Sequence, residues 1–111
     1  MERLQQILDF LKESPQDPFL NYALTMEYVK LGQDEDALRC FEKMVQDFPD
    51  YVGTYYHFGK FLEKSGTPER AAEVYQQGIT VARAGRKMHA LNELQGALRL
   101  LEDPDWDEDD Y

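Results

Sequence analysis

The 111-residue sequence has one cysteine, two histidines and no long run of apolar residues. The single cysteine, Cys40, excludes a disulfide within the chain and is typical of a reducing compartment. No segment approaches the roughly 18 consecutive apolar residues that a membrane span needs. The first residues, MERLQQILDFLKES, also lack the continuous apolar block of a secretory signal peptide. We therefore expect a cytoplasmic protein that does not interact with membranes.

Basic residues are scarce. The chain carries 12 lysines and arginines against 22 aspartates and glutamates, a formal net charge of -10. Seven of the acidic residues lie in the C-terminal stretch EDPDWDEDDY, which leaves 15 acidic against 12 basic residues elsewhere. A nucleic-acid-binding protein needs a basic surface to meet phosphates. The composition therefore predicts no nucleic-acid partner.

Catalytic and metal-binding motifs are also missing. His57 and His89 have no cysteine, histidine or carboxylate at a ligand or catalytic spacing. No cationic motif accompanies Cys40, which favours a packing thiol over a nucleophile. No phosphate-binding loop, dinucleotide-binding glycine pattern or serine elbow occurs. We expect no catalytic residue, no metal site and no cofactor, and hence no enzyme.

The chain does contain an internal repeat of 34 residues. Residues 18–51 align with residues 52–85 so that small and aromatic residues coincide: Gly32 with Gly66, Ala37 with Ala71, and Phe41 with Tyr75. Each unit reads as two helices, with the two glycines ending the first helix and Thr67 placed to cap the last. The expected buried stripes are Asn21, Leu24, Thr25, Tyr28, Leu38, Phe41, Val45 and Phe48 in one unit and Tyr55, Phe58, Gly59, Leu62, Ala71, Val74, Tyr75 and Ile79 in the other.

The repeat resembles the tetratricopeptide repeat (TPR) pattern W-x2-L-G-x2-Y, A-x3-F, P. The first unit has Asn21-x2-Leu24-Thr25-x2-Tyr28, then Ala37-x3-Phe41, then Pro49. The second has Tyr55-x2-Phe58-Gly59-x2-Leu62, then Ala71-x3-Tyr75, with Arg83 in the place of the proline. The resemblance implies an all-α fold, an α-solenoid of antiparallel helix pairs.

The flanks extend this pattern. Residues 1–15 form a half-repeat: they stand in the position of the second helix of a repeat whose first helix is missing. The expected buried stripe of this helix is Leu4, Ile7, Leu8 and Leu11. Residues 86–102 predict a capping helix that buries Met88, Leu91, Leu94, Leu98 and Leu101. We therefore expect six helices in a single domain over residues 1–102, followed by an acidic, disordered tail at 103–111. The ending of the last helix is similar to that of small stand-alone bacterial members of the family.

The inner, concave face implied by the resemblance carries an apolar strip edged by lysines. Its residues are Phe19, Tyr22, Met26, Val29, Lys30, Tyr56, Lys60 and Lys64. An exposed strip of this kind is typical of a binding surface, although the capping helix or a second copy could also cover it. We expect a non-catalytic module that holds a peptide or helix of another protein there. The alternative is a structural protein that homodimerises through the same strip.

Some relatives bind a C-terminal carboxylate through lysine, asparagine and arginine on the inner face. The corresponding places here hold Tyr22, Met26, His57 and Leu91, so the resemblance does not extend to that site. A mixed apolar and acidic peptide is the expected ligand, with Lys30, Lys60 and Lys64 as its charge partners.

The tail sequence DPDWDEDD places aspartates at alternate positions, as the start of a calcium-binding loop does. Glu108 stands where that loop needs glycine, so we expect no specific calcium site. A solubilising tail is one interpretation. Another is that Trp106 and Tyr111, set among acidic residues, dock in an aromatic groove of this chain or of a neighbour.

Overall fold

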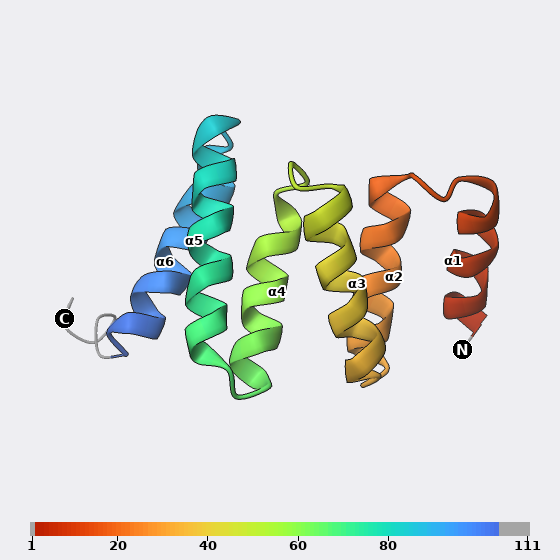
Figure 1. Ribbon diagram of the computed structural model, residues 1–111, viewed down its shortest axis with the longest axis horizontal. Coiled ribbons are helices and arrows are strands. Elements are labelled where there is room, and N and C mark those ends of the chain that lie inside the picture. The colour runs from red at the N-terminus through yellow and green to blue at the C-terminus, as the bar shows by residue number, and fades with distance from the viewer. Residues whose placement is uncertain (1, 105–111) are drawn as a thin grey trace. The chain divides into compact units, whose positions relative to one another are not determined.

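The computed structural model describes residues 2–104, and this part of the chain is built from six helices without a strand (Figure 1). The helices are α1 (Glu2–Glu13), α2 (Pro18–Lys30), α3 (Asp34–Asp47), α4 (Gly53–Lys64), α5 (Pro68–Ala84) and α6 (Met88–Glu102). The prediction of an all-α fold with six helices is confirmed. The interpretations of the tail from Asp105 to Tyr111, including the role of Trp106, concern residues outside the described part.

The chain divides into two compact units, one up to Tyr51 and the other from Val52, where the second sequence repeat begins. In the N-terminal unit, α1 packs against α2 and α2 packs against α3. Of the residues expected in the core, five are buried: Leu4, Ile7, Asn21, Thr25 and Phe41. The other expected residues of this unit are only half-buried: Leu8, Leu11, Leu24, Tyr28, Leu38, Val45 and Phe48. Met44, which was not among the expected core residues, is 1% exposed and belongs to the buried face of α3.

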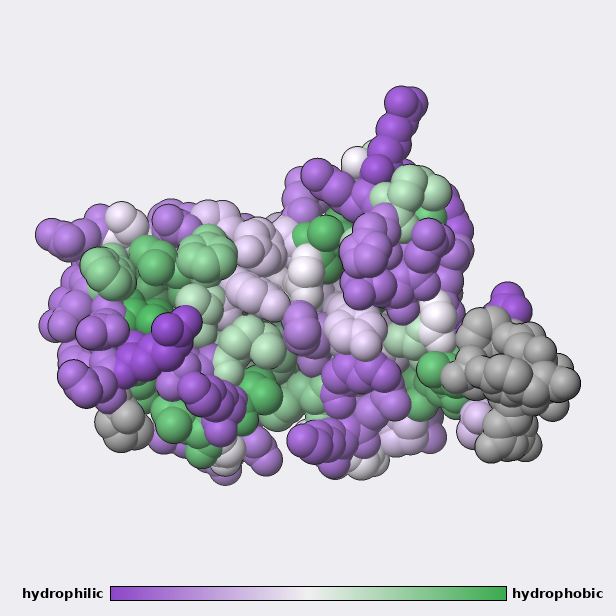
Figure 2. Space-filling model, turned by 180° about the vertical axis from the view of Figure 1, so that it is seen from behind, coloured by the Kyte–Doolittle hydropathy of each residue, from purple (hydrophilic) through white to green (hydrophobic). Residues whose placement is uncertain are grey.

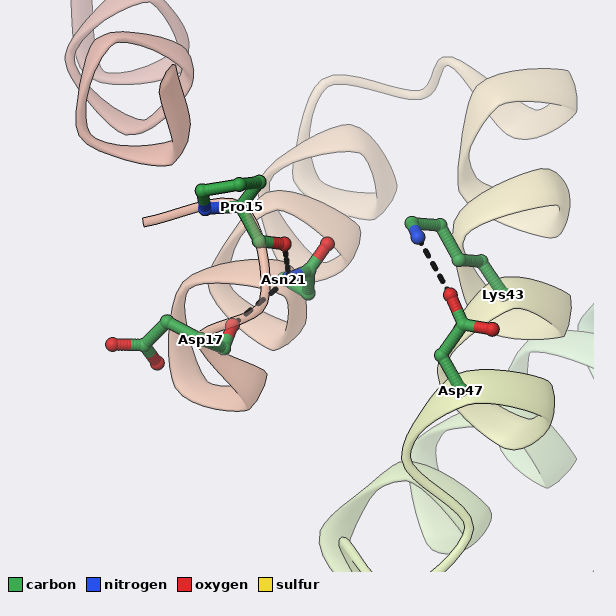
Figure 3. A network of polar contacts seen from close by, with 5 residues as sticks. All are labelled: Pro15, Asp17, Asn21, Lys43 and Asp47. Atoms are coloured by element: carbon green, nitrogen blue, oxygen red, sulfur yellow. Dashed lines mark hydrogen bonds and ion pairs between the residues drawn. The ribbon is translucent and has the colours of Figure 1, made fainter. Parts of the chain in front are cut away.

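Asn21 shows why the first repeat departs from the family pattern. Its side chain is 7% exposed and points into the loop between α1 and α2 (Figure 3). The Nδ2 group donates hydrogen bonds to the carbonyl oxygens of Pro15, at 3.0 Å, and Asp17, at 2.9 Å. Asp17 also caps α2, because its carboxylate accepts a hydrogen bond from the backbone N–H of Leu20. The asparagine thus fastens the loop that positions α1 on α2.

In the C-terminal unit, α5 packs against both α4 and α6, and α4 also contacts α6. All eight residues expected in the core of the second repeat are buried. Gly59 is required by the packing, since a Cβ atom there would lie 2.1 Å from Cε1 of the Tyr75 ring. The expectation for Met88 is wrong: its side chain is 58% exposed. Met88 is the first residue of α6, where Ala97 and not Met88 completes the buried face.

Three turns of the same kind precede α3, α5 and α6. Gly32 and Gly66 have the left-handed φ angles of 72° and 84°, and Arg86 has φ 57° at the third turn. The first two turns follow the first helices of the repeats, α2 and α4, whereas the third follows α5, a second helix. Thr67 is the N-cap residue of α5, but its hydroxyl donates to the Leu62 carbonyl at 3.1 Å instead of capping the helix.

Candidate functional site

A pocket of about 370 Å³ opens on the N-terminal unit along one side of α2. Four of the predicted site residues line it: Phe19, Tyr22, Met26 and Lys30. These residues share one side of the helix because they follow each other at intervals of three and four. Figure 2 shows hydrophobic residues gathered on this part of the chain, at the left of that view. The Phe19 side chain is 62% exposed.

The packing of α2 is partly inverted: its most deeply buried side chains are polar, whereas the apolar Leu20, Leu24 and Tyr28 are only half-buried. The described residues that α2 buries are the polar Asn21, Thr25 and Glu27, which are 7%, 0% and 6% exposed. The apolar Phe19 and Met26 lie on the pocket side instead. Thr25 tolerates burial because its hydroxyl donates to the Asn21 carbonyl at 2.8 Å. The hydrophobic pattern of α2 thus disagrees with the burial of its side chains, and functional surfaces are often found where such a disagreement occurs.

Tyr22 forms the wall of the pocket and is held by a second aromatic ring. Its ring centroid lies 5.4 Å from that of Tyr51, with a 41° angle between the planes. Burial raises the pKa of the Tyr22 hydroxyl, and the neighbouring Tyr51 raises it further. The side chain therefore stays neutral across the physiological range and offers both apolar area and a hydroxyl to a ligand.

The rim of the pocket is charged, and part of this rim was missed by sequence reasoning. Arg3, on α1, forms an ion pair with Glu27, on α2, with 3.2 Å between Nε and Oε1. The Glu27 side chain is 7% exposed, whereas that of Arg3 is 69% exposed. Lys30 is exposed at the end of α2. Two cations and one carboxylate thus surround the apolar pocket. Arg3 and Glu27 are 24 positions apart, so no local spacing indicates the pair.

The other predicted site residues lie outside this pocket. Val29 is half-buried and does not line it. On α4, the Lys60 Nζ lies 5.5 Å from the Tyr56 ring centroid, within the range of a cation–π contact. Lys60 also lies 3.8 Å from the Glu63 carboxylate, and Lys64 is exposed at the end of the helix. A role for these four residues in binding remains a prediction.

The groups with potential for chemistry are arranged as structural residues. Burial foremost raises the pKa of the half-buried Cys40 thiol, which keeps the thiol protonated and unreactive. Burial lowers the pKa of His57, partly opposed by Glu93. His89 is exposed and lies 3.6 Å from the Glu93 carboxylate. Within residues 2–104, no three histidine, cysteine or acidic side chains are grouped as metal ligands would be.

The six described helices include none with both the length and the apolar character needed to cross a membrane.

Comparison with solved structures gives clear relatives. The crystal structure of a tetratricopeptide repeat domain protein from Salinibacter ruber is 45% identical in sequence, with a TM-score of 0.75. The match covers 78% of this chain and 98% of that one. A solution structure under the same description matches at 45% identity over 79% of this chain and 89% of that one, with a TM-score of 0.76.

A protein from Bordetella parapertussis shares the fold at 22% identity, with a TM-score of 0.78 over 92% of this chain and 89% of that one. No protein-family model matches the sequence, and no curated protein is similar to it. The repeat, the helix pairs and the Salinibacter structures nevertheless agree, and the chain belongs to the tetratricopeptide repeat family.

Proposed function

We propose that this chain binds a segment of another protein in the α2 pocket, and that the segment carries both apolar and acidic side chains. Membership of the tetratricopeptide repeat family supports a protein–protein interaction module in general. The observation that supports this particular site is the inverted packing of α2. The helix buries three polar residues and leaves Phe19 62% exposed beside a pocket.

The chemistry of the pocket favours a ligand of mixed character. Phe19, Tyr22 and Met26 offer apolar area, and methionine adapts its shape to different side chains. Lys30 and Arg3 bring positive charge to the rim, where an acidic group of the ligand would approach. Glu27 is already paired with Arg3 and orients its guanidinium group. The pocket volume of about 370 Å³ is enough for one or two large side chains.

The second repeat carries residues that correspond to those of the α2 pocket. Residues 34 positions after those of the α2 pocket include Tyr56 for Tyr22 and Lys64 for Lys30. Lys60 takes the place of Met26 and stacks near the Tyr56 ring. We infer that α4 presents an aromatic and basic version of the same site.

Two phenylalanines of the N-terminal unit provide a matched test. Phe19 is 62% exposed and lines the pocket, whereas Phe10 is 59% exposed on α1 and does not line it. Peptides selected from a random display library on the wild-type chain are titrated by calorimetry against Phe19→Ala and Phe10→Ala. We expect Phe19→Ala to weaken binding about tenfold, or roughly 1.4 kcal/mol, and Phe10→Ala to leave it unchanged. Equal affinity for both variants would remove the pocket assignment.

The same pair of variants tests the alternative of self-assembly. A homodimer that dissociates in Phe19→Ala but persists in Phe10→Ala, measured by light scattering, would assign the exposed surface of α2 to a second copy of this chain. A monomeric wild type that binds selected peptides supports the proposal.

A further inference from the structure

A second groove, of about 310 Å³, lies between α5 and α6 in the C-terminal unit. Ile79, 4% exposed, contributes its apolar base together with the half-buried Leu98. Arg83 and Arg99 line it from the two helices, with Glu102 at one end. A shallower hollow of about 530 Å³ adjoins this groove and shares Leu98 and Glu102 with it. We call the 310 Å³ hollow the terminal groove.

The terminal groove exists because α6 is a first helix that no second helix follows within the described residues. Leu91, Leu94 and Leu98 have the same spacing as Tyr55, Phe58 and Leu62 on α4. On α4 the last residue of this set, Leu62, is 3% exposed. Its counterpart on α6, Leu98, stays half-buried and accessible from the groove. An apolar side chain that the repeat pattern places inside is therefore left at the surface.

The residue beside Leu98 argues against a helix as the occupant. On α4 the equivalent position is Gly59, where a Cβ atom would lie 2.1 Å from the Tyr75 ring of α5. On α6 this position is Gln95, which is exposed and lines the terminal groove. A helix packed as closely as α5 is on α4 would meet the Gln95 side chain. The groove thus fits an extended segment with one large side chain better than a helix from a second copy.

We propose that the chain's own C-terminal segment, residues 103–111, folds back on α6 and places the Trp106 side chain in the terminal groove against Leu98. The described chain leaves α6 at Glu102, which itself lines the groove. Trp106 follows four residues later, so an extended chain can carry it up to roughly 14 Å from this point. The segment needs no long loop to reach the groove, which keeps the entropic cost of closure low.

The charges of the groove suit this segment. Arg83 and Arg99 bring two guanidinium groups from adjacent helices, against one carboxylate from Glu102. The segment around Trp106 has Asp105, Asp107, Glu108, Asp109 and Asp110 but no basic residue. The positive charge of this lining attracts a segment of opposite charge and favours the acidic residues beside the groove. The docked segment would shield Leu98 at the end of the repeat, as a capping element does in other repeat proteins.

Trp106 is the single tryptophan of the chain, so its fluorescence reports on the docked state directly. In the folded 111-residue chain we expect Trp106 emission that is blue-shifted relative to the urea-unfolded chain, and acrylamide quenching that is several times slower. Leu98→Ser should remove both effects. Leu100→Ser is the matched control, because Leu100 is 38% exposed on the same helix and does not line the groove.

Arg99→Gln serves as a second variant that leaves the apolar packing intact, and it should weaken the protection of Trp106 from quenching. Far-UV circular dichroism confirms that each variant is folded. The proposal would be overturned if the emission of Trp106 were identical in the folded and the unfolded chain. It would also be overturned if acrylamide quenched Trp106 equally in Leu98→Ser and in the wild type. A blue shift that disappears on dilution would also overturn it, because the occupant would then be the tail of a second copy.

Discussion

Gly78 is a position where one added methyl group should be strongly destabilising. It lies in the middle of α5, facing α4. A Cβ atom at this position would lie 2.4 Å from the Cβ atom and 2.9 Å from the Cγ atom of Tyr55, and 3.1 Å from Cδ1 of Leu94. Tyr55 is 0% exposed, and its Cβ atom is attached directly to the α4 backbone. Rotation of the side chain cannot relieve this contact, so Gly78→Ala must push α4 and α5 apart.

The size of the effect follows from two opposing contributions. Carbon atoms in contact stay about 3.5 Å or more apart, so the helices would have to separate by roughly 1 Å. Overpacking of a well-packed core costs about 3 kcal/mol when backbone has to move. Replacing glycine by alanine inside a helix returns about 1 kcal/mol. We expect Gly78→Ala to lower the free energy of unfolding by about 2 kcal/mol.

Gly96→Ala is the matched control, since Gly96 lies inside α6 and an added Cβ atom there meets nothing within 4 Å. This variant should gain the helix contribution of about 1 kcal/mol without a packing cost. Urea unfolding followed by helical circular dichroism should therefore separate the two variants by about 3 kcal/mol, or roughly 12 °C in melting temperature. A Gly78→Ala protein as stable as Gly96→Ala would refute the close approach of α4 and α5.

Three further predictions concern single residues. Arg86→Gly should stabilise the fold by about 0.5–1 kcal/mol in urea unfolding, because Arg86 holds a φ angle of 57° that glycine adopts without strain. Asn21→Ala should cost about 1–2 kcal/mol by losing two hydrogen bonds to the α1–α2 loop, whereas Asn92→Ala, at an exposed position, should cost little. Burial, and then a hydrogen bond donated to Glu63, raise the pKa of Tyr75 above its usual 10.0. As the pH rises, the unfolded chain therefore loses the Tyr75 hydroxyl proton before the folded chain does. The free energy of unfolding of the wild type should fall above pH 10 by up to about 1.4 kcal/mol per pH unit. Tyr75→Phe should flatten this fall in melting curves recorded at alkaline pH.

Much of the fold could be predicted from the sequence because repeated packing leaves a repeated pattern. The positions of Gly59, Ala71 and Tyr75 follow from one rule, that two antiparallel helices approach closely only where one side is small. The pattern was weaker at the ends. Met88 looks like part of the α6 stripe, yet it lies in the first turn, beyond the reach of the neighbouring helices. On α3 the buried face runs through Ala37, Phe41 and Met44, at intervals of four and three, whereas Val45 and Phe48, expected in the stripe, are only half-buried.

The candidate site was only partly predictable. Phe19, Tyr22 and Met26 could be placed together because a single helix carries them. Arg3 and Glu27 could not, since their ion pair depends on how α1 packs against α2. Helical periodicity identifies which residues share a face, but it does not say which distant side chain faces them. Charged pairs between helices therefore need coordinates.

The inverted packing of α2 leaves the Phe19 ring exposed, and this exposure is the best reason to assign the helix a function. A helix that buried Phe19 and exposed Thr25 would gain apolar burial and lose no hydrogen bond, because water can satisfy an exposed hydroxyl. α5, in the other unit, follows the ordinary rule and buries Val74, Tyr75 and Ile79. Stability alone does not account for the exposed ring of Phe19, whereas a ligand that covers this ring would recover the missing burial on binding.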